Sequence, residues 1–203
     1  MTPPRIALMG ASGTGKTTLA RELSRRLCLP MEQWLIPEEG GVESTTRHVA
    51  RKLFGEPLPY LATPGRDGTR AKFQNELLVT KRSWELAHLQ TGFVTDRTHV
   101  CNAAYWFLED SAGPGRDSRY LELIRDAMRT YSHVWLCSVD EFYHAGQDPA
   151  RKSDLAYQRA VEALMIVLCE QFRIPFSRVR GSGAQERAAL VQAYAHPSRE
   201  VGG

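Results

Sequence analysis

Apolar and polar positions alternate in two ways along the chain: in short apolar runs, which are typical of strands, and in longer segments with helical spacing. Strands are predicted at 5–9, 31–36, 93–96, 133–139 and 174–179. Helices are predicted at about 15–27, 44–54, 70–90, 102–108, 118–130, 154–172 and 184–195. This order predicts an α/β fold with a parallel sheet between two layers of helices and with ligands at the carboxyl ends of the strands.

Length and composition favour one domain, over residues 1–196, with a flexible tail at 197–203. The net charge of +3 is a mild excess that helps to hold anions but falls short of a dedicated nucleic-acid binder. The four cysteines form no C-x-x-C pair, which favours buried free thiols over a metal site. No apolar run approaches the roughly 18 residues of a membrane span. We therefore expect a cytoplasmic protein without a membrane anchor, either a monomer or a homodimer.

A glycine-rich run follows the first predicted strand and fits the motif G-x-x-x-x-G-K-[ST] without a mismatch. It comprises Gly10, Ala11, Ser12, Gly13, Thr14, Gly15, Lys16, Thr17 and Thr18. Glycines allow the backbone to approach phosphate oxygens closely, Lys16 supplies a cation and Thr17 a hydroxyl for Mg²⁺. We expect all of these residues except Ala11 to bind the phosphates of a nucleoside triphosphate. The alternative, a turn that merely joins a strand to a helix, is disfavoured by the flanking pattern.

Two further strand ends carry charged residues. Asp96 and Arg97 follow the strand at 93–96, where a carboxylate suits Mg²⁺ and an arginine suits phosphoryl charge. The alternative for Asp96 is a cap on the next helix. Glu38 and Glu39 follow the second strand, and either could accept the proton of an attacking hydroxyl, although paired acids near a turn are often only solvated.

A polar segment from Gly146 to Asp154 contains the adjacent cations Arg151 and Lys152. Its position after a strand suits a lid that closes over phosphates and excludes water. We favour Arg151 because its planar guanidinium can bridge two phosphate oxygens. A solvated loop that begins a basic helix is the alternative.

The glycine-rich run, the stretch from Asp96 to Tyr105 and the basic segment together resemble the P-loop nucleoside and nucleotide kinase superfamily. The pattern is most similar to its ribosylnicotinamide-kinase-like and deoxynucleoside-kinase-like branch. The resemblance implies a three-layer fold with five parallel strands in the order 2-3-1-4-5. It also implies ATP and Mg²⁺ as cofactors and a hydroxyl or phosphate as acceptor.

The same resemblance implies roles for residues by position. Lys16 and Thr17 would hold phosphate and metal, Asp96 would be a metal or catalytic carboxylate, Arg97 a clamp on substrate or phosphate, and Arg151 the lid arginine. The second strand is followed by Glu-Glu-Gly-Gly, where related kinases more often have an acid and then an arginine. Arg47 is a candidate for that cation.

Acceptor recognition is expected between residues 38 and 90, with a lid at about 140–154. Besides Glu38, Glu39, Arg47 and Arg97, the candidates there are Arg66, Arg70, Phe73 and Gln74. An aromatic ring with amide groups suits a nucleobase, and an arginine suits a phosphate. Phe73 at helical spacing also fits a core residue.

Other functions compete with this one. Val139-Asp140-Glu141 resembles the strand ending of ATPases in which the glutamate, here Glu141, activates water. A signalling GTPase is disfavoured because Arg151 stands where the guanine-reading motif has asparagine. Among kinases, a DNA acceptor with a 5′ hydroxyl or a hydroxymethylated base, as in phage DNA modification, is compatible with the motifs. It would need a basic track such as Arg116, Arg119, Arg125 and Arg129, which also fits a solvated helix face.

Overall fold

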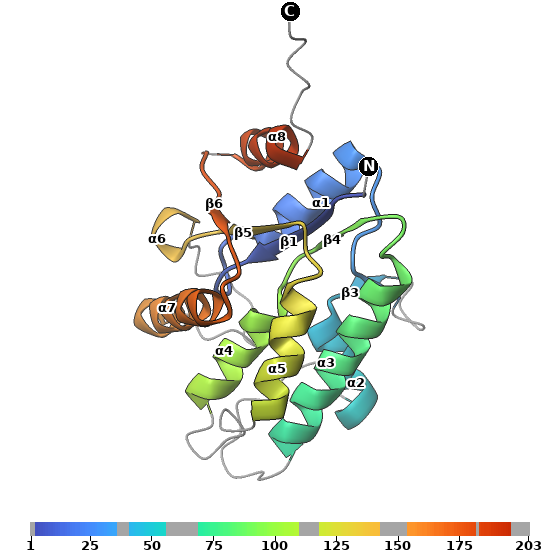
Figure 1. Cartoon of the computed structure of the whole chain (residues 1–203), viewed down its shortest axis with the longest axis vertical. Helices are drawn as coiled ribbons and strands as arrows, with labels where there is room; N and C mark the ends of the chain where they lie inside the picture. Colours follow the sequence, from blue (N-terminus) through green and yellow to red (C-terminus); the bar gives the residue numbers. More distant parts are fainter. Residues whose placement is uncertain are drawn as a thin grey trace, which may run out of the picture.

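A parallel sheet lies at the centre of the computed structural model, which describes residues 3–35, 41–55, 69–109, 118–142, 154–181 and 183–195 (Figure 1). Its strands are β1 (Arg5–Met9), β4 (Phe93–Thr95), β5 (His133–Leu136) and β6 (Ser177–Arg178). The order is β4-β1-β5-β6, and every neighbouring pair is parallel. Residues 6–9 of β1 are buried, as expected for a strand with helices on both faces.

The predicted second strand is the main difference from the five-stranded expectation. Around Met31 the chain makes only an isolated parallel bridge to Val94, on the outer side of β4, where the order 2-3-1-4-5 would place it. The chain then leaves the sheet, and β2 (Trp34–Leu35) pairs antiparallel with β3 (Val42–Glu43). The described sheet therefore has four strands and one bridge, because the residues after Met31 pair with their own hairpin partner instead of with β4.

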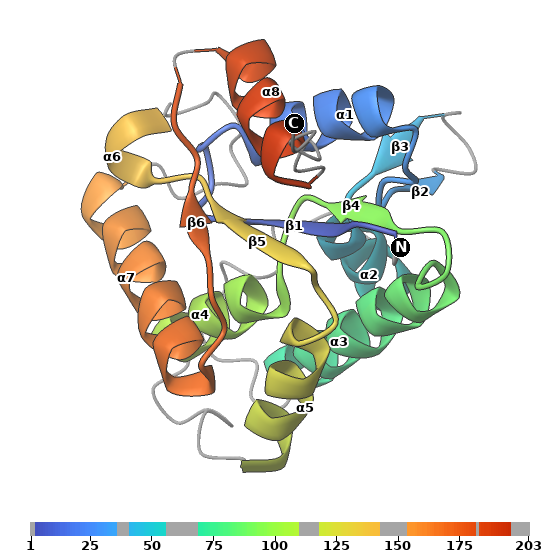
Figure 2. The ribbon, with the colours of Figure 1, turned by 45° about the horizontal axis from the view of Figure 1, so that its top comes forward.

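Helices cover both faces of this sheet (Figure 2). Ile6 and Leu8 pack with α1 (Lys16–Leu27) and α8 (Ala184–Ala195) on one face. Ala7 and Met9 point to the other face, which packs against α4 (His99–Glu109), α5 (Ser118–Met128) and α7 (Leu155–Phe172), with two residues of α3 (Thr69–Ala87). Two smaller helices are α2 (Thr45–Phe54), which packs on α3, and α6 (Val139–Phe142). The alternation along β1 thus produces the predicted three layers.

Three local expectations change. The strands β5 and β6 are shorter than 133–139 and 174–179, and α6 begins within the segment that was expected to be strand and polar loop. Cys101, Cys137 and Cys169 are buried free thiols as expected, but Cys28 is exposed because it follows the end of α1 in the left-handed conformation. None of the described helices is both long and apolar enough to cross a membrane.

Candidate functional site

The glycine-rich run forms a loop between β1 and α1, and Gly10, Gly13 and Gly15 within it all have positive φ. Gly10 has φ of 145°, and a Cβ there would collide with the carbonyl oxygen of Cys137. Gly15 has φ of 76° and caps the N-terminus of α1 in the left-handed conformation. The loop therefore presents backbone N–H groups and the positive end of α1 at the carboxyl end of β1, which is the geometry of an anion-binding site.

Lys16 lies inside this loop and is buried. Its Nζ donates hydrogen bonds to the carbonyl oxygen of Ala11 and to the hydroxyl of Thr14, the latter at 3.2 Å. Burial, followed by the nearby charge of Arg97, lowers the pKa of Lys16 to about 8. A bound phosphate would add negative charge next to this ammonium and so favour its protonated form.

The end of β4 brings a carboxylate to the loop. The hydroxyl of Thr17, in the first turn of α1, donates a hydrogen bond to the carboxylate of Asp96. A hydroxyl and a carboxylate side by side next to a phosphate-binding loop are oxygen ligands of the kind that Mg²⁺ prefers. No group of three or more histidine, cysteine, aspartate or glutamate side chains that could hold a metal occurs in the described part of the chain. Thr17 and Asp96 thus fit a magnesium ion that is shared with a nucleotide.

A tyrosine on α4 connects the loop with Arg97. The hydroxyl of Tyr105 accepts a hydrogen bond from the backbone N–H of Ser12 at 2.8 Å and donates one to Gln158 Oε1, on α7, at 3.1 Å. The guanidinium of Arg97 lies 5.3 Å from the centre of the same ring, within the range of a cation–π contact. Four segments therefore meet at Tyr105.

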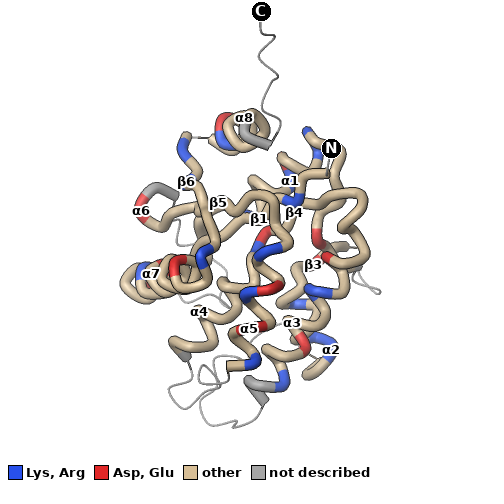
Figure 3. Tube along the Cα trace, in the orientation of Figure 1, with Lys and Arg blue, Asp and Glu red and all other residues tan. Residues whose placement is uncertain are grey.

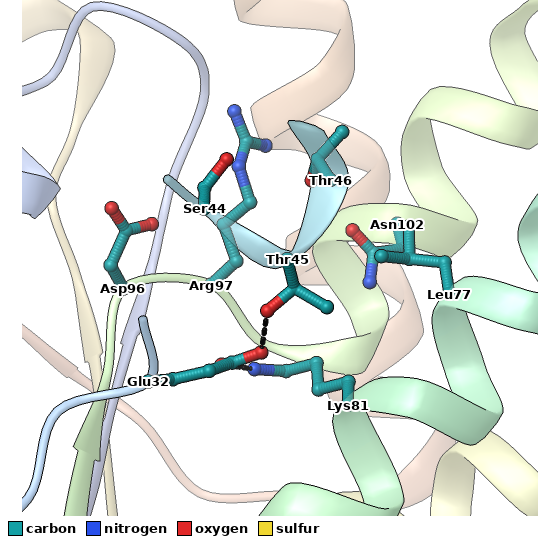
Figure 4. A pocket seen from close by; sticks show the side chains of 9 residues that line it. All are labelled: Glu32, Ser44, Thr45, Thr46, Leu77, Lys81, Asp96, Arg97 and Asn102. Atoms are coloured by element: carbon teal, nitrogen blue, oxygen red, sulfur yellow. Dashed lines mark hydrogen bonds and ion pairs between the residues drawn. The ribbon is translucent and has the colours of Figure 1, made fainter. Parts of the chain in front are cut away.

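A pocket opens beside Asp96 and Arg97 (Figure 4). Its described lining consists of Glu32, Ser44, Thr45, Thr46, Leu77, Lys81, Asp96, Arg97 and Asn102. These side chains come from the chain after Met31, from the start of α2, from α3 and α4, and from the two residues that follow β4. All but Leu77 are polar, so the pocket suits a polar ligand.

Below the pocket lies a buried network of charges. Lys81 contacts Glu32 and lies 3.4 Å from Glu85, whose carboxylate accepts hydrogen bonds from His99 and Tyr131. Burial alone would raise the pKa of Glu85, but the charges of His99 and Lys81 and these hydrogen bonds outweigh it and lower the pKa to about 2. The ammonium of Lys81 keeps a raised pKa despite its burial because two carboxylates face it.

Comparison with known proteins places these features in a family. A protein-family model described as an AAA domain matches residues 5–187. The chain belongs to this AAA domain family. No curated protein matches the sequence.

Several solved structures that share this fold are kinases. Thymidylate kinase from Candida albicans is 14% identical with a TM-score of 0.62, and the match covers 98% of this chain and 93% of that one. Deoxyadenosine kinase from M. mycoides with bound dATP is 15% identical with a TM-score of 0.58, over 94% and 99% of the two chains. Shikimate kinase from Acinetobacter baumannii, in complex with shikimate, is 16% identical with a TM-score of 0.56, over 98% and 96%. The predicted three-layer P-loop fold is confirmed.

The predicted site residues fall into two groups within this P-loop fold. The structure brings together the loop at 10–18, Asp96 and Arg97. Other candidates lie outside the described residues, namely Glu38, Glu39, Arg66 and Arg151, together with the side chains of Arg70 and Glu141. Their proposed roles remain predictions.

Three candidates on α2 and α3 are described but do not line the pocket. Phe73 is 1% exposed and packs in a hydrophobic cluster with Val49 and Leu77, so it is a core residue as the alternative interpretation had it. Gln74 is buried next to it, and its Oε1 has no hydrogen-bond partner in the described structure. Arg47 lies in the first turn of α2, half-buried.

The charges of the pocket floor were missed by sequence reasoning. The predicted strand at 31–36 contains Glu32 and the predicted helix at 70–90 contains Lys81 and Glu85, whereas His99 falls in no predicted element. A signal did exist, since Lys81 stands four residues after Leu77 and eight after Phe73, on the apolar face of α3. A lysine on a buried helix face requires a carboxylate partner, but its identity depends on the tertiary structure.

Proposed function

We propose that this protein is a kinase that transfers the γ-phosphoryl group of ATP to a hydroxyl or phosphate of a small acceptor of the nucleoside or nucleotide type. One observation carries the proposal: Asp96 contacts Thr17 of the phosphate-binding loop and also lines the neighbouring pocket. A single carboxylate thus borders both the position of a nucleotide and the position of a second molecule. A protein that only hydrolyses ATP has no need of such an adjoining pocket.

The roles of the residues follow from their places. The loop N–H groups and Lys16 would bind the β- and γ-phosphates, while Thr17 and Asp96 would hold Mg²⁺, which neutralises phosphate charge. Arg97, fixed against Tyr105, would clamp the transferred group or the acceptor. Arg151 is the proposed lid arginine, and Glu38 or Glu39 the proposed base.

The ATPase alternative has some support, because the family is described as an AAA domain and Glu141 follows the hydrophobic strand β5. Its neighbour Asp140, however, is 67% exposed and forms an ion pair at 2.8 Å with Arg159 on α7. Asp140 also lies beyond the end of β5, within α6, whereas Asp96 follows the end of β4 directly and contacts Thr17. The contact to the phosphate-binding loop therefore favours Asp96 as the metal-site carboxylate.

The DNA alternative lacks a matching surface in the described part of the chain. Figure 3 shows acidic and basic residues interspersed along α3 and α5. On α5, Asp126 lies within ion-pair distance of both Arg125 and Arg129. A track for a DNA backbone would instead be of one sign. A small acceptor is the better-supported choice.

Incubation with γ-labelled ATP, Mg²⁺ and a panel of nucleosides, nucleotides, ribosylnicotinamide and plain or hydroxymethylated DNA tests the proposal. We expect label on a small acceptor and its loss in Lys16→Ala and Asp96→Asn. The matched variant Asp140→Asn should leave transfer unchanged, because Asp140 contacts neither the loop nor the pocket lining. Label only in inorganic phosphate, with turnover abolished by Glu141→Gln, would overturn the kinase in favour of the ATPase.

A further inference from the structure

The N-terminus of α2 opens into the pocket. Ser44 is the N-cap residue, and with Thr45 and Thr46 it lines the cavity. No side chain caps the first turn, and the first turn has no acidic residue. The N–H groups at the start of this ten-residue helix are therefore available to a ligand, and the helix dipole favours a negative one.

A second feature points to the same ligand. Asn102, on α4, is only 8% exposed, lines the pocket and makes no hydrogen bond to any described residue. Figure 4 shows its amide directed into the cavity, across from Thr46. The two N–H groups of this amide are suited to donate to an oxygen acceptor in the pocket.

The charges around the pocket distinguish its two sides. Lys81 and the hydroxyl of Thr45 are already engaged by the carboxylate of Glu32, so this part of the floor is compensated. The guanidinium of Arg97 extends beside Ser44 and Thr46 (Figure 4). Asp96 stands on the opposite side of the cavity from Asn102. Arg97 adds positive charge to the lining, and no described carboxylate lies within ion-pair distance of its guanidinium, although the charge of Asp96 raises its pKa from further away. Asp96 itself borders the phosphate-binding loop through Thr17.

We infer that the start of α2, Asn102 and Arg97 form a binding site for an oxyanion, a phosphate monoester or a carboxylate, carried by the acceptor. The acceptor then spans the pocket, with its oxyanion at Asn102 and its reacting group at Asp96. That the bound molecule is the phosphoryl acceptor rests on the proposed function, whereas the oxyanion site depends only on the residues of the pocket. It narrows the substrate class to molecules that already bear a negative group, such as a nucleotide or a hydroxy acid.

A titration of inorganic phosphate tests the site without any turnover. The full chain is first saturated with Mg²⁺ and a non-hydrolysable ATP analogue, so that the phosphate-binding loop is occupied. We expect calorimetry to show binding of one further phosphate, weakened about tenfold or more by Asn102→Leu and by the isosteric Asn102→Asp. A parallel titration with acetate separates a carboxylate site from a phosphate site. The exposed Asn75 on α3 provides the matched control Asn75→Leu, which should leave binding unchanged.

Absence of phosphate and acetate binding to the loaded protein, or binding that the Asn102 variants do not alter, would overturn the oxyanion site. Circular dichroism of each variant shows whether it is folded, and the hydroxyl-deleting Thr46→Val gives an independent test if Asn102→Leu is not. The titration decides the site even where no acceptor is phosphorylated, so its failure is distinguishable from failure of the kinase proposal.

Where transfer occurs, paired acceptors extend the test. A nucleoside is compared with its 5′-monophosphate, and a polyol with a hydroxy acid of the same size. We expect the charged member to have a KM about tenfold lower, and Asn102→Asp to raise that KM while leaving the KM for ATP unchanged. Preference for the neutral member in both pairs would overturn the oxyanion site while the kinase stands.

Discussion

At the scale of single residues, buried ionisable groups determine how the site responds to pH. Lys16 has its pKa lowered to about 8, mainly by burial. A triphosphate next to it favours the ammonium form and so raises this pKa again. Protonation of Lys16 and nucleotide binding are therefore linked, and the linkage operates above a pH of about 8.

We predict that binding of an ATP analogue takes up a proton at alkaline pH and that its affinity falls as the pH rises beyond the pKa of the free protein. Calorimetry in two buffers with different ionisation enthalpies measures this uptake. Lys16→Ala should abolish the buffer dependence along with most of the affinity. Equal heats in both buffers at pH 8.5 (about half a unit above the pKa of Lys16) would show that the proton stays on Lys16 throughout.

Glu85 instead makes the free energy of unfolding depend on pH, and its contribution is lost as the pH falls. Its pKa falls from an ordinary 4.5 to about 2 in the folded state, so the unfolded chain binds more protons in that interval. Its contribution, on the order of 3 kcal/mol, is present at neutral pH and is lost as the pH falls from about 4.5 to about 2. Urea unfolding of wild type and Glu85→Gln should show a difference at pH 7 that shrinks steadily on acidification. A difference that is independent of pH would contradict this assignment.

At the scale of elements, Tyr105 connects α4, α7 and the phosphate-binding loop. The N–H of Ser12 reaches both the Tyr105 hydroxyl and Gln158 Oε1, the latter at 3.0 Å. When one of these two acceptors is removed, the other still accepts a hydrogen bond from the Ser12 N–H. Each single substitution should therefore have only part of the full effect. The ring of Tyr105 keeps its place against Arg97 when only the hydroxyl is removed.

We predict that Tyr105→Phe and Gln158→Leu each weaken binding of an ATP analogue by about 1 kcal/mol, and that the double variant loses more than the sum. The reason is that the Ser12 N–H has no remaining partner in the described structure only when both are changed. A double-mutant cycle by calorimetry measures the coupling, with Tyr157→Phe as a control on the neighbouring tyrosine of α7. Strict additivity would show that the two contacts act independently.

At the scale of the whole molecule, the Glu32–Lys81–Glu85 network holds together parts that are distant in sequence. Glu32 follows the bridge to β4, Lys81 and Glu85 lie on α3, and His99 begins α4. Lys81 is 1% exposed and Glu85 fully buried, so removal of one charge leaves the others without compensation in a medium of low polarity.

We predict that Lys81→Met lowers the free energy of unfolding by about 3–5 kcal/mol and that Glu32→Gln in the same chain restores part of this loss. Urea denaturation of the single and double variants measures both. Lys52→Met, which breaks the exposed pair with Glu76, should cost less than about 1 kcal/mol. A similar cost for the two lysines would contradict a buried network.

Much of the architecture follows from local pattern. The strand at 5–9 and the helix at 184–195 have the predicted bounds, and the helices α1, α2 and α7 differ from prediction by a single residue at one end. The prediction that residues 31–36 form a strand of the central sheet was met only by the bridge at Met31, and the residues after it pair with Val42 and Glu43 instead of with β4. The reason is that an apolar run does not reveal which neighbour it will pair with. Strand pairing depends on the whole fold, whereas the helices repeat their own apolar spacing.

The sequence by itself determined the phosphate-binding loop and the three-layer order, because both depend on residues that are close together along the chain. The tertiary structure alone decided which charges meet. Thr17 and Asp96 are far apart in sequence, as are Glu32 and Lys81, and burial gives such pairs energies that no local pattern contains. The same holds for Asn102: it belongs to the stretch that resembles the kinases, but only the fold places its amide opposite the start of α2.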